Sequence, residues 1–190
     1  MTTPVLLIVG LGNPGAQYTQ TRHNAGFWFV DALTRTARVE CRYDSKFHGE
    51  VAKCDGTSAY WLLKPTTFMN HSGRAVQALQ QFYKIPATQM LVVHDDLDLP
   101  VGTARLKRGG GHGGHNGLRD IIAQLGTPDF LRLRLGIGHP GQREQVVDYV
   151  LKKASIADEQ AIIDAIERSL TVLPELLSGA IEKAMQRLHS

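Results

Sequence analysis

The fold is decided by residues 5–27, which read "VLLIVGLGNPGAQYTQTRHNAGF". The first five residues form a continuous apolar run, which is typical of a central β-strand buried on both faces. Glycines follow at positions 10, 12 and 15, and an apolar pattern with helical spacing runs from residue 25 to residue 37. This order predicts a strand, a tight turn and a helix, with a site above the end of the strand.

The three glycines also match G-x-G-x-x-G, the fingerprint of dinucleotide-binding folds. A dinucleotide site needs a helix that opens directly after the last glycine and an acidic residue at the end of the second strand. Here the polar segment 16–22 intervenes, and Asp31 falls inside the predicted helix. The sequence therefore disfavours NAD binding and favours a turn that directs Asn13 and the following loop towards a site above the strand.

Strands and helices alternate through the rest of the chain. We expect further strands at residues 48–54, 59–65, 90–94, 103–107 and 130–138. Helices are expected from about residue 70, over 118–125, and in the tail, where Ser155 and Asp158 form a capping box and Pro174 breaks the pattern. The sequence thus predicts an α/β fold in a single domain, residues 1–190, with a mixed, mostly parallel β-sheet and helices packed on both faces.

The composition narrows the classes of function. The 190 residues are 43% hydrophobic with a formal net charge of +3, and the pI of about 9.0 favours an anionic partner such as nucleic acid. Cys41 and Cys54 have no metal-binding spacing, and no apolar run approaches the length of a membrane span. We expect a reduced, cytoplasmic protein.

Residues suited to hydrolytic chemistry follow several of the predicted elements. They are imidazoles, carboxylates and carboxamides: Asn13, His23, Asn70, His94, Asp95, Asp96, Asp98, His112, His115 and Asn116. Because the ends of neighbouring strands meet at one edge of a sheet, we expect these groups to share a cleft. In such a cleft a histidine takes a proton from water, a carboxylate holds its tautomer, and amides stabilise a carbonyl oxygen.

The same residues also have structural interpretations. His23 is placed to cap the following helix, and Asp95 and Asp96 are common turn formers. Asn70 and Asn116 are equally well placed as helix N-caps.

Two further features leave alternatives open. The H-x-x-H spacing within 112–115 suggests a metal site, although it lies in a glycine loop rather than on a rigid helix. Arg105 and Lys107 alternate along one predicted strand, and Arg132 and Arg134 alternate along another. These basic residues form either a solvated polar face or a stripe that contacts RNA phosphates.

Five blocks of sequence together resemble the bacterial peptidyl-tRNA hydrolase family. They are "IVGLGNPGAQYTQTRHNAG" (8–26), "KPTTFMNHSG" (64–73), "VVHDDLDLP" (92–100), "GGGHGGHNGLRDII" (109–122) and "RLRLGIGHPG" (132–141). They occur in the family's order. The resemblance implies a compact monomer that hydrolyses, without a metal, the ester joining a peptide to the 3′-terminal ribose of tRNA. This reaction recycles tRNA from peptidyl-tRNA released by stalled ribosomes.

The resemblance also implies roles for individual residues. The catalytic residues that it implies are His23 as general base, Asp95 as the carboxylate that orients it, and Asn13 as a group that distinguishes blocked from free amino groups. The binding residues that it implies are Tyr18, Phe68, Asn70 and Asn116 around the peptide and terminal adenosine, His115 as a neighbouring support, and Lys107 and Arg134 as a phosphate clamp. It implies tRNA as the partner, no cofactor and no obligate protein partner.

The chemistry of selectivity agrees with these roles. Carboxamides such as Asn13 and Asn70 can pair with the neutral amide of a peptide, whereas an unpaired ammonium is costly to desolvate. Two other classes of function stay open. One is an RNA-binding module without catalysis, although such a module has no need of His23 and Asp95. The other is a metal-dependent hydrolase built on His94, Asp95, Asp98 and His115.

Overall fold

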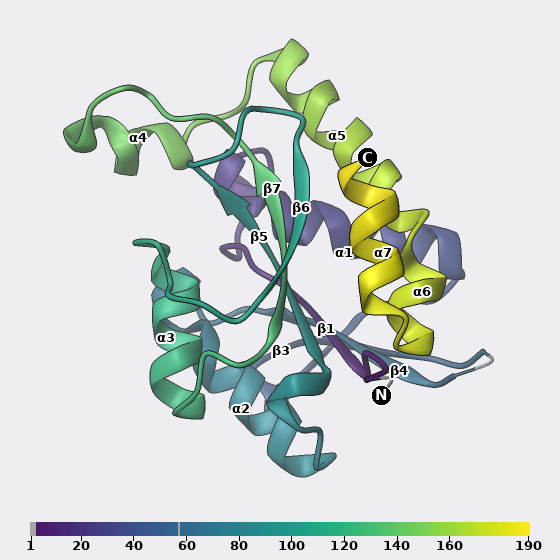
Figure 1. Ribbon diagram of the computed structural model, residues 1–190. Coiled ribbons are helices and arrows are strands. Elements are labelled where there is room, and N and C mark those ends of the chain that lie inside the picture. The colour runs from purple at the N-terminus through teal and green to yellow at the C-terminus, as the bar shows by residue number, and fades with distance from the viewer. Residues whose placement is uncertain (1–2, 57) are drawn as a thin grey trace.

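The computed structural model describes residues 3–56 and 58–190. Its centre is a mixed seven-stranded sheet with the strand order β2-β3-β4-β1-β5-β7-β6 (Figure 1). The strands are β1 (Leu7–Gly10), β2 (Arg42–Asp44), β3 (Gly49–Cys54), β4 (Tyr60–Pro65), β5 (Met90–Asp96), β6 (Ala104–Arg108) and β7 (Leu131–Gly136). The central pairs β4–β1, β1–β5 and β5–β7 are parallel, and the outer pairs are antiparallel. The expected mixed sheet is confirmed, although three of its six strand pairs are parallel rather than most of them.

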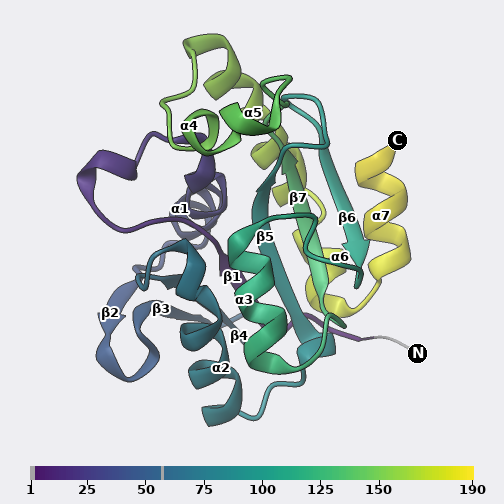
Figure 2. The ribbon, with the colours of Figure 1, turned by 90° about the vertical axis from the view of Figure 1, so that its left-hand side faces the viewer.

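Helices pack on both faces of this sheet, as the α/β pattern predicts (Figures 1 and 2). One face is covered by α1 (Ala25–Ala37), α5 (Ile156–Leu170), α6 (Leu173–Ser178) and α7 (Ile181–His189), and the other by α2 (Ser72–Phe82) and α3 (Asn116–Leu125). Strand β1 supplies Ile8 to the first core and Leu7 and Val9 to the second. Its sequence is a continuous apolar run because both of its faces are buried.

The glycines that follow β1 let helix α1 approach the sheet closely. A Cβ atom on Gly10 would stand 2.3 Å from the carbonyl oxygen of Gly26, and one on Gly26 would stand 2.4 Å from the backbone of Leu11 and Val93. Short 3-10 turns (Ala16–Tyr18 and Arg22–Asn24) separate these glycines from α1. The G-x-G-x-x-G stretch therefore serves backbone packing and a turn, and no helix opens directly after it as a dinucleotide site requires.

Most of the predicted elements are confirmed. Helix α1 has the predicted bounds, the Ser155 hydroxyl accepts a hydrogen bond from the backbone N–H of Asp158 at the start of α5, and the tail divides just before Pro174. Strand β2 and helix α4 (Val146–Val150) were not predicted, because both are short and largely exposed. Within the described residues, no helix is both long and apolar enough to cross a membrane.

The structural interpretation is right for Asp96, whose Oδ1 accepts from the backbone N–H of Asp98 in the turn after β5, and wrong for the other polar residues. Asn70 lies in a 3-10 turn before α2, and His115, rather than Asn116, caps α3. His23 makes no cap, and Asp95 lies in β5 rather than in a turn. Their side chains are consequently free for a role at the edge of the sheet.

Candidate active site

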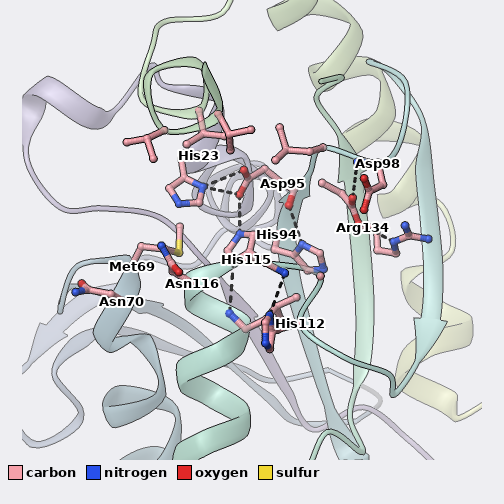
Figure 3. Close-up of a pocket in the computed structure, with 18 of the residues that line it drawn as sticks. His23, Met69, Asn70, His94, Asp95, Asp98, His112, His115, Asn116 and Arg134 are labelled. Carbon is pink, nitrogen blue, oxygen red and sulfur yellow. Dashed lines mark hydrogen bonds and ion pairs between the residues drawn. The ribbon is translucent and has the colours of Figure 1, made fainter. Parts of the chain in front are cut away.

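A cavity of about 650 Å³ lies at the carboxyl ends of the central parallel strands. Figure 3 shows its polar side chains converging from β5, from the turn before α1 and from the start of α3. The site residues predicted from the sequence all line this cavity: Asn13, Tyr18, His23, Phe68, Asn70, Asp95, Lys107, His115, Asn116 and Arg134. Apolar side chains of α4, including Val147, and Leu151 directly after it also line the cavity, and these were not predicted.

His23 and Asp95 form the centre of the site. The Nδ1 atom of His23 lies 3.0 Å from Oδ1 and 2.9 Å from Oδ2 of Asp95. The Asp95 side chain is 2% exposed, and that of His23 is 12% exposed. Because a carboxylate can only accept, Nδ1 of His23 carries the proton and Nε2 keeps a lone pair.

His115 holds the same carboxylate from the other side. Its Nε2 atom lies 2.9 Å from Asp95 Oδ1, while its Nδ1 accepts from the backbone N–H groups of Gly117 and Leu118 at 3.1 and 3.4 Å. Backbone N–H groups can only donate, so Nδ1 carries no proton and Nε2–H donates to Asp95. His115 is therefore a neutral donor with a fixed tautomer.

The electrostatics of this group favour an ionised Asp95. Burial raises the pKa of the Asp95 carboxyl, but the positive charge that His23 can carry and the hydrogen bonds from His23 and His115 outweigh burial and leave the pKa well below its ordinary value. Burial lowers the pKa of the His23 imidazole, and the charge and hydrogen bond of Asp95 more than reverse this, so the pKa of His23 is raised. The pair is thus a carboxylate beside a basic imidazole.

His94 is excluded from acid–base work by its surroundings. Its Nδ1–H donates to the backbone carbonyl of Asp95 at 2.8 Å, and its Nε2 is buried without a hydrogen-bond partner among the described residues. Burial, followed by the neighbouring His115, lowers the pKa of His94 to about 4. His94 is a neutral, buried ring behind the site.

Asn13 is oriented by bonds at both its side chain and its backbone. Its Oδ1 accepts from the backbone N–H of Met69 at 2.7 Å. Its backbone N–H donates to Oδ1 of Asn24 at 2.9 Å, and its carbonyl accepts from Nδ2 of Asn24 at 3.0 Å. Since the Asn13 oxygen is occupied, this side chain offers N–H donors. Pairing of this side chain with the amide of a peptide would therefore use the carbonyl oxygen of that amide.

Asn24 supports the site from behind, and the sequence reasoning missed it. It directly follows His23, is fully buried, and brackets the peptide units of Asn13. The hydrogen bonds of Asn24 thereby link the segment that carries the His23 imidazole to the turn that carries the Asn13 carboxamide. The only hint in the sequence was that Asn24 stands next to His23, the candidate base. Its hydrogen bonds to Asn13, eleven positions earlier, could not be predicted from residue spacing.

The rim of the cavity carries exposed aromatic groups. Phe68 is 49% exposed and has φ 63°, ψ 156°, a backbone conformation that costs a bulky residue about 1–3 kcal/mol. The next residue is Met69, whose N–H reaches Asn13, and the Tyr18 ring lies edge-on to Phe68 with centroids 6.3 Å apart. The strained turn therefore both orients Asn13 and presents a ring at the rim.

The basic residues divide into two groups. Lys107 is exposed and lines the cavity, and Arg134 lines it while donating from Nε to Asp96 Oδ2 at 2.7 Å. Arg132, in contrast, is 2% exposed and donates to the carbonyls of Gly110 and Gly111. Neither alternative, a solvated face or a phosphate stripe, fits Arg132, because the glycine loop folds over it and uses its donors.

Three residues of the site have the geometry of a potential metal cluster. Among the described residues, His23, Asp95 and His115 bring one ligand atom each to within 4.8 Å of one another. A metal ion would need the lone pair of His115 Nε2, which requires a proton on Nδ1 against two backbone donors. His94 and Asp98 do not join this group in the part of the chain that the structure describes. The arrangement suits hydrogen bonding better than metal ligation.

Comparisons with known proteins agree on one family. The family model described as "Peptidyl-tRNA hydrolase" matches residues 7–190. A peptidyl-tRNA hydrolase of Methylobacillus flagellatus is 62% identical over 187 residues, covering 98% of this chain and 97% of that protein, and one of Coxiella burnetii is 55% identical over the full length of both. A crystal structure of peptidyl-tRNA hydrolase from Acinetobacter baumannii superposes with a TM-score of 0.97 at 44% identity, covering 100% of this chain and 97% of that one.

Proposed function

The chain belongs to the peptidyl-tRNA hydrolase family, whose members cleave the ester bond of peptidyl-tRNA, and we propose that His23 is the base that activates water for this reaction. The observation that carries the proposal is the bond from His23 Nδ1 to the buried Asp95. Because this bond uses the proton on Nδ1, the lone pair of Nε2 is available to accept a proton from water. A neutral imidazole with this tautomer is the form that a general base requires.

The reaction follows from this tautomer. Nε2 of His23 takes a proton from a water molecule as the water oxygen bonds to the ester carbonyl carbon. The carbonyl oxygen becomes an oxyanion, and His23 becomes an imidazolium beside Asp95. When the oxyanion collapses, the bond to the ribose oxygen breaks and the imidazolium returns the proton to that oxygen. The products are a free carboxylic acid and the terminal ribose hydroxyl of tRNA, and no metal or cofactor is required.

Asn13 is the group we assign to the oxyanion. Its Oδ1 is bonded to Met69, so its amide presents N–H donors, and oriented donors stabilise a developing oxyanion. Asn24 acts through Asn13 as a positioning residue. His115 acts through Asp95, because its fixed donor holds the carboxylate while adding no positive charge.

The rim residues bind the substrate. Tyr18 and Phe68 offer ring surfaces to the peptide and the terminal adenosine, and the exposed carboxamides of Asn70 and Asn116 offer hydrogen bonds. The neutral amide of a peptide fits this rim, whereas a free ammonium would lose its hydration without a carboxylate partner, which explains selectivity for blocked amino groups.

The phosphates of tRNA are bound at the same edge of the sheet by Lys107 and Arg134. The Arg134 guanidinium is held by Asp96 through Nε, which orients its terminal N–H groups while reducing the net positive charge of the site. Lys107 therefore carries the larger share of the electrostatic attraction. We further propose that residues 1–190 act as one domain and as a monomer that recycles tRNA.

A hydrolysis assay on N-acetyl-aminoacyl-tRNA in EDTA tests the proposal. The wild type keeps its activity, His23→Ala loses it, and the matched control His71→Ala, an exposed histidine outside the cavity, behaves as the wild type. Activity retained by His23→Ala contradicts the assigned base. Wild-type activity that EDTA abolishes favours the metal-dependent hydrolase, and tRNA binding by a wild type that does not hydrolyse favours the binding module.

A further inference from the structure

The outer edge of the sheet beside the site is closed by the C-terminal helix. Strand β6 is the last strand of the sheet, and helix α7 lies along it (Figure 1). The backbone N–H of Leu106 in β6 donates to Nε2 of His189, at a distance of 3.0 Å. At an open sheet edge, this N–H would bond to a carbonyl group of a neighbouring strand. Here the imidazole of His189 is the acceptor instead.

Other contacts hold the same two elements together. Ile181 and Ala184 of α7 share a buried core with Leu106, and the Arg108 guanidinium donates to Oε1 of Glu182 at 2.8 Å. The ion pair is exposed and contributes little. The ladder with β7 sets the register of β6 along its own axis, and the apolar contacts set the distance between helix and strand. The hydrogen bond from the Leu106 N–H to His189 holds the free edge of the strand against α7.

The imidazole of His189 is suited to accept. Burial, and then the positive charge of Arg105, lower its pKa from the ordinary value. The neutral ring therefore persists at physiological pH, with its proton on Nδ1 and the lone pair of Nε2 on the Leu106 amide.

The residue that follows Leu106 is Lys107, which lines the active-site cavity. The end of its side chain lies close to the glycine loop, since its Nζ is 2.9 Å from the point where a Cβ atom on Gly110 would stand. Separation of the edge of β6 from α7 would move this ammonium relative to the loop and to the cavity. We infer that His189 is a positioning residue for peptidyl-tRNA binding: it anchors the strand that carries Lys107. The inference rests on the phosphate-binding role proposed for Lys107.

Amide hydrogen exchange and steady-state kinetics on the full chain test the inference together. In His189→Ala the Leu106 amide exchanges faster than in the wild type, by about two- to tenfold or more for one lost hydrogen bond. The KM for N-acetyl-aminoacyl-tRNA rises by about the same factor while kcat is unchanged. His189→Gln, whose Oε1 reaches the position of Nε2, restores both values, whereas the shorter His189→Asn restores neither. Gln186→Ala, an exposed change on the same helix, leaves both unchanged.

The outcomes separate this inference from the role of Lys107. If Lys107→Ala does not change KM, the phosphate role fails, while Leu106 exchange still shows whether His189 anchors the strand. If Lys107→Ala raises KM, the double variant with His189→Ala should have nearly the same KM as Lys107→Ala alone, because both changes act through Lys107. Unchanged exchange of Leu106 in His189→Ala, a loss confined to kcat, or failure of His189→Gln to restore exchange overturns the inference.

Discussion

The inner part of the cavity and its rim are built in opposite ways. The inner residues (His23, Asp95, His115 and Asn13) have little exposure, and each has a ring nitrogen, carboxylate or carboxamide oxygen held by a hydrogen bond. The rim residues (Phe68, Asn70, Lys107 and Asn116) are exposed, and no side-chain hydrogen bond fixes them to other described residues. Groups that act on developing charge are oriented before the substrate arrives, and groups that bind the substrate stay free to meet it. Changes inside should therefore lower kcat, and changes at the rim should raise KM.

Replacing the buried carboxylate is the most severe change that keeps the shape of the inner group. Asp95→Asn should lower kcat on the order of 10³–10⁴-fold, since the His23 ring loses the partner that holds its tautomer. Activity needs neutral His23, so the rate rises with pH through the raised pKa of this residue. Removing the Asp95 charge removes what raises that pKa, so the acid limb of the pH–rate profile should shift to lower pH. A limb that stays in place or moves to higher pH would show that another group titrates.

Removing the oxyanion donor should have the next largest effect. Asn13→Ala should lower kcat about 10²–10³-fold with little change in KM. Asn24→Ala frees the peptide units of Asn13 and should lower kcat less. If Asn13 bound only the ground state of the peptide, the loss would appear in KM, and the division between the inner part and the rim would fail at this residue.

His115 allows its two structural roles to be separated. His115→Ala should lower kcat about tenfold through the lost bond to Asp95 and lower the free energy of unfolding by about 1 kcal/mol through the lost N-cap. His115→Asn keeps a capping oxygen but is too short to reach Asp95. It should recover stability in thermal unfolding without recovering kcat. Joint recovery of both would mean that His115 acts only as a cap.

The smallest expected effects lie at the rim, where Phe68 is both strained and exposed. Phe68→Ala and Phe68→Gly both remove the ring, and each should raise KM several-fold with kcat nearly unchanged. Glycine adopts the positive φ of this position without strain, so the glycine variant should be more stable than the alanine variant by about 1 kcal/mol. Equal melting temperatures for the two variants would contradict the strain, and a large fall in kcat would place Phe68 with the inner residues.

The residues alone predicted that His23 and Asp95 share a cleft, because each follows a predicted buried strand, whereas their roles as base and orienting carboxylate were implied by the family resemblance. The apolar runs before Asn13 and Asp95 identify neighbouring parallel strands, whose carboxyl ends meet at one edge of the sheet. The role of Asn24 could not be predicted in this way, since its partners are backbone atoms of another turn. Local spacing contains no information on such a contact.

The alternation of arginines and leucines in residues 130–138 correctly predicted which side chains share a face of the sheet, but not which of them are exposed. Arg132 and Arg134 alternate with leucines as predicted, yet the glycine loop 109–114 folds over Arg132 alone and satisfies its guanidinium with carbonyl groups. The capping residue of α3 was also misassigned within "GGHNG", because both His115 and Asn116 can accept backbone N–H groups there. The conformation of the positive-φ glycines decides between them, and the sequence does not specify it.

The tautomers of His23 and His115 test the central claim most directly. Nitrogen-15 NMR of the histidine side chains, measured at a pH above the raised pKa of His23, distinguishes a protonated from an unprotonated ring nitrogen. The account predicts opposite tautomers in the two rings, with the proton on Nδ1 in His23 and on Nε2 in His115. A proton on Nε2 of His23 would leave the water without its base and would contradict the account, and a proton on Nδ1 of His115 would contradict its assignment as the acceptor that caps α3.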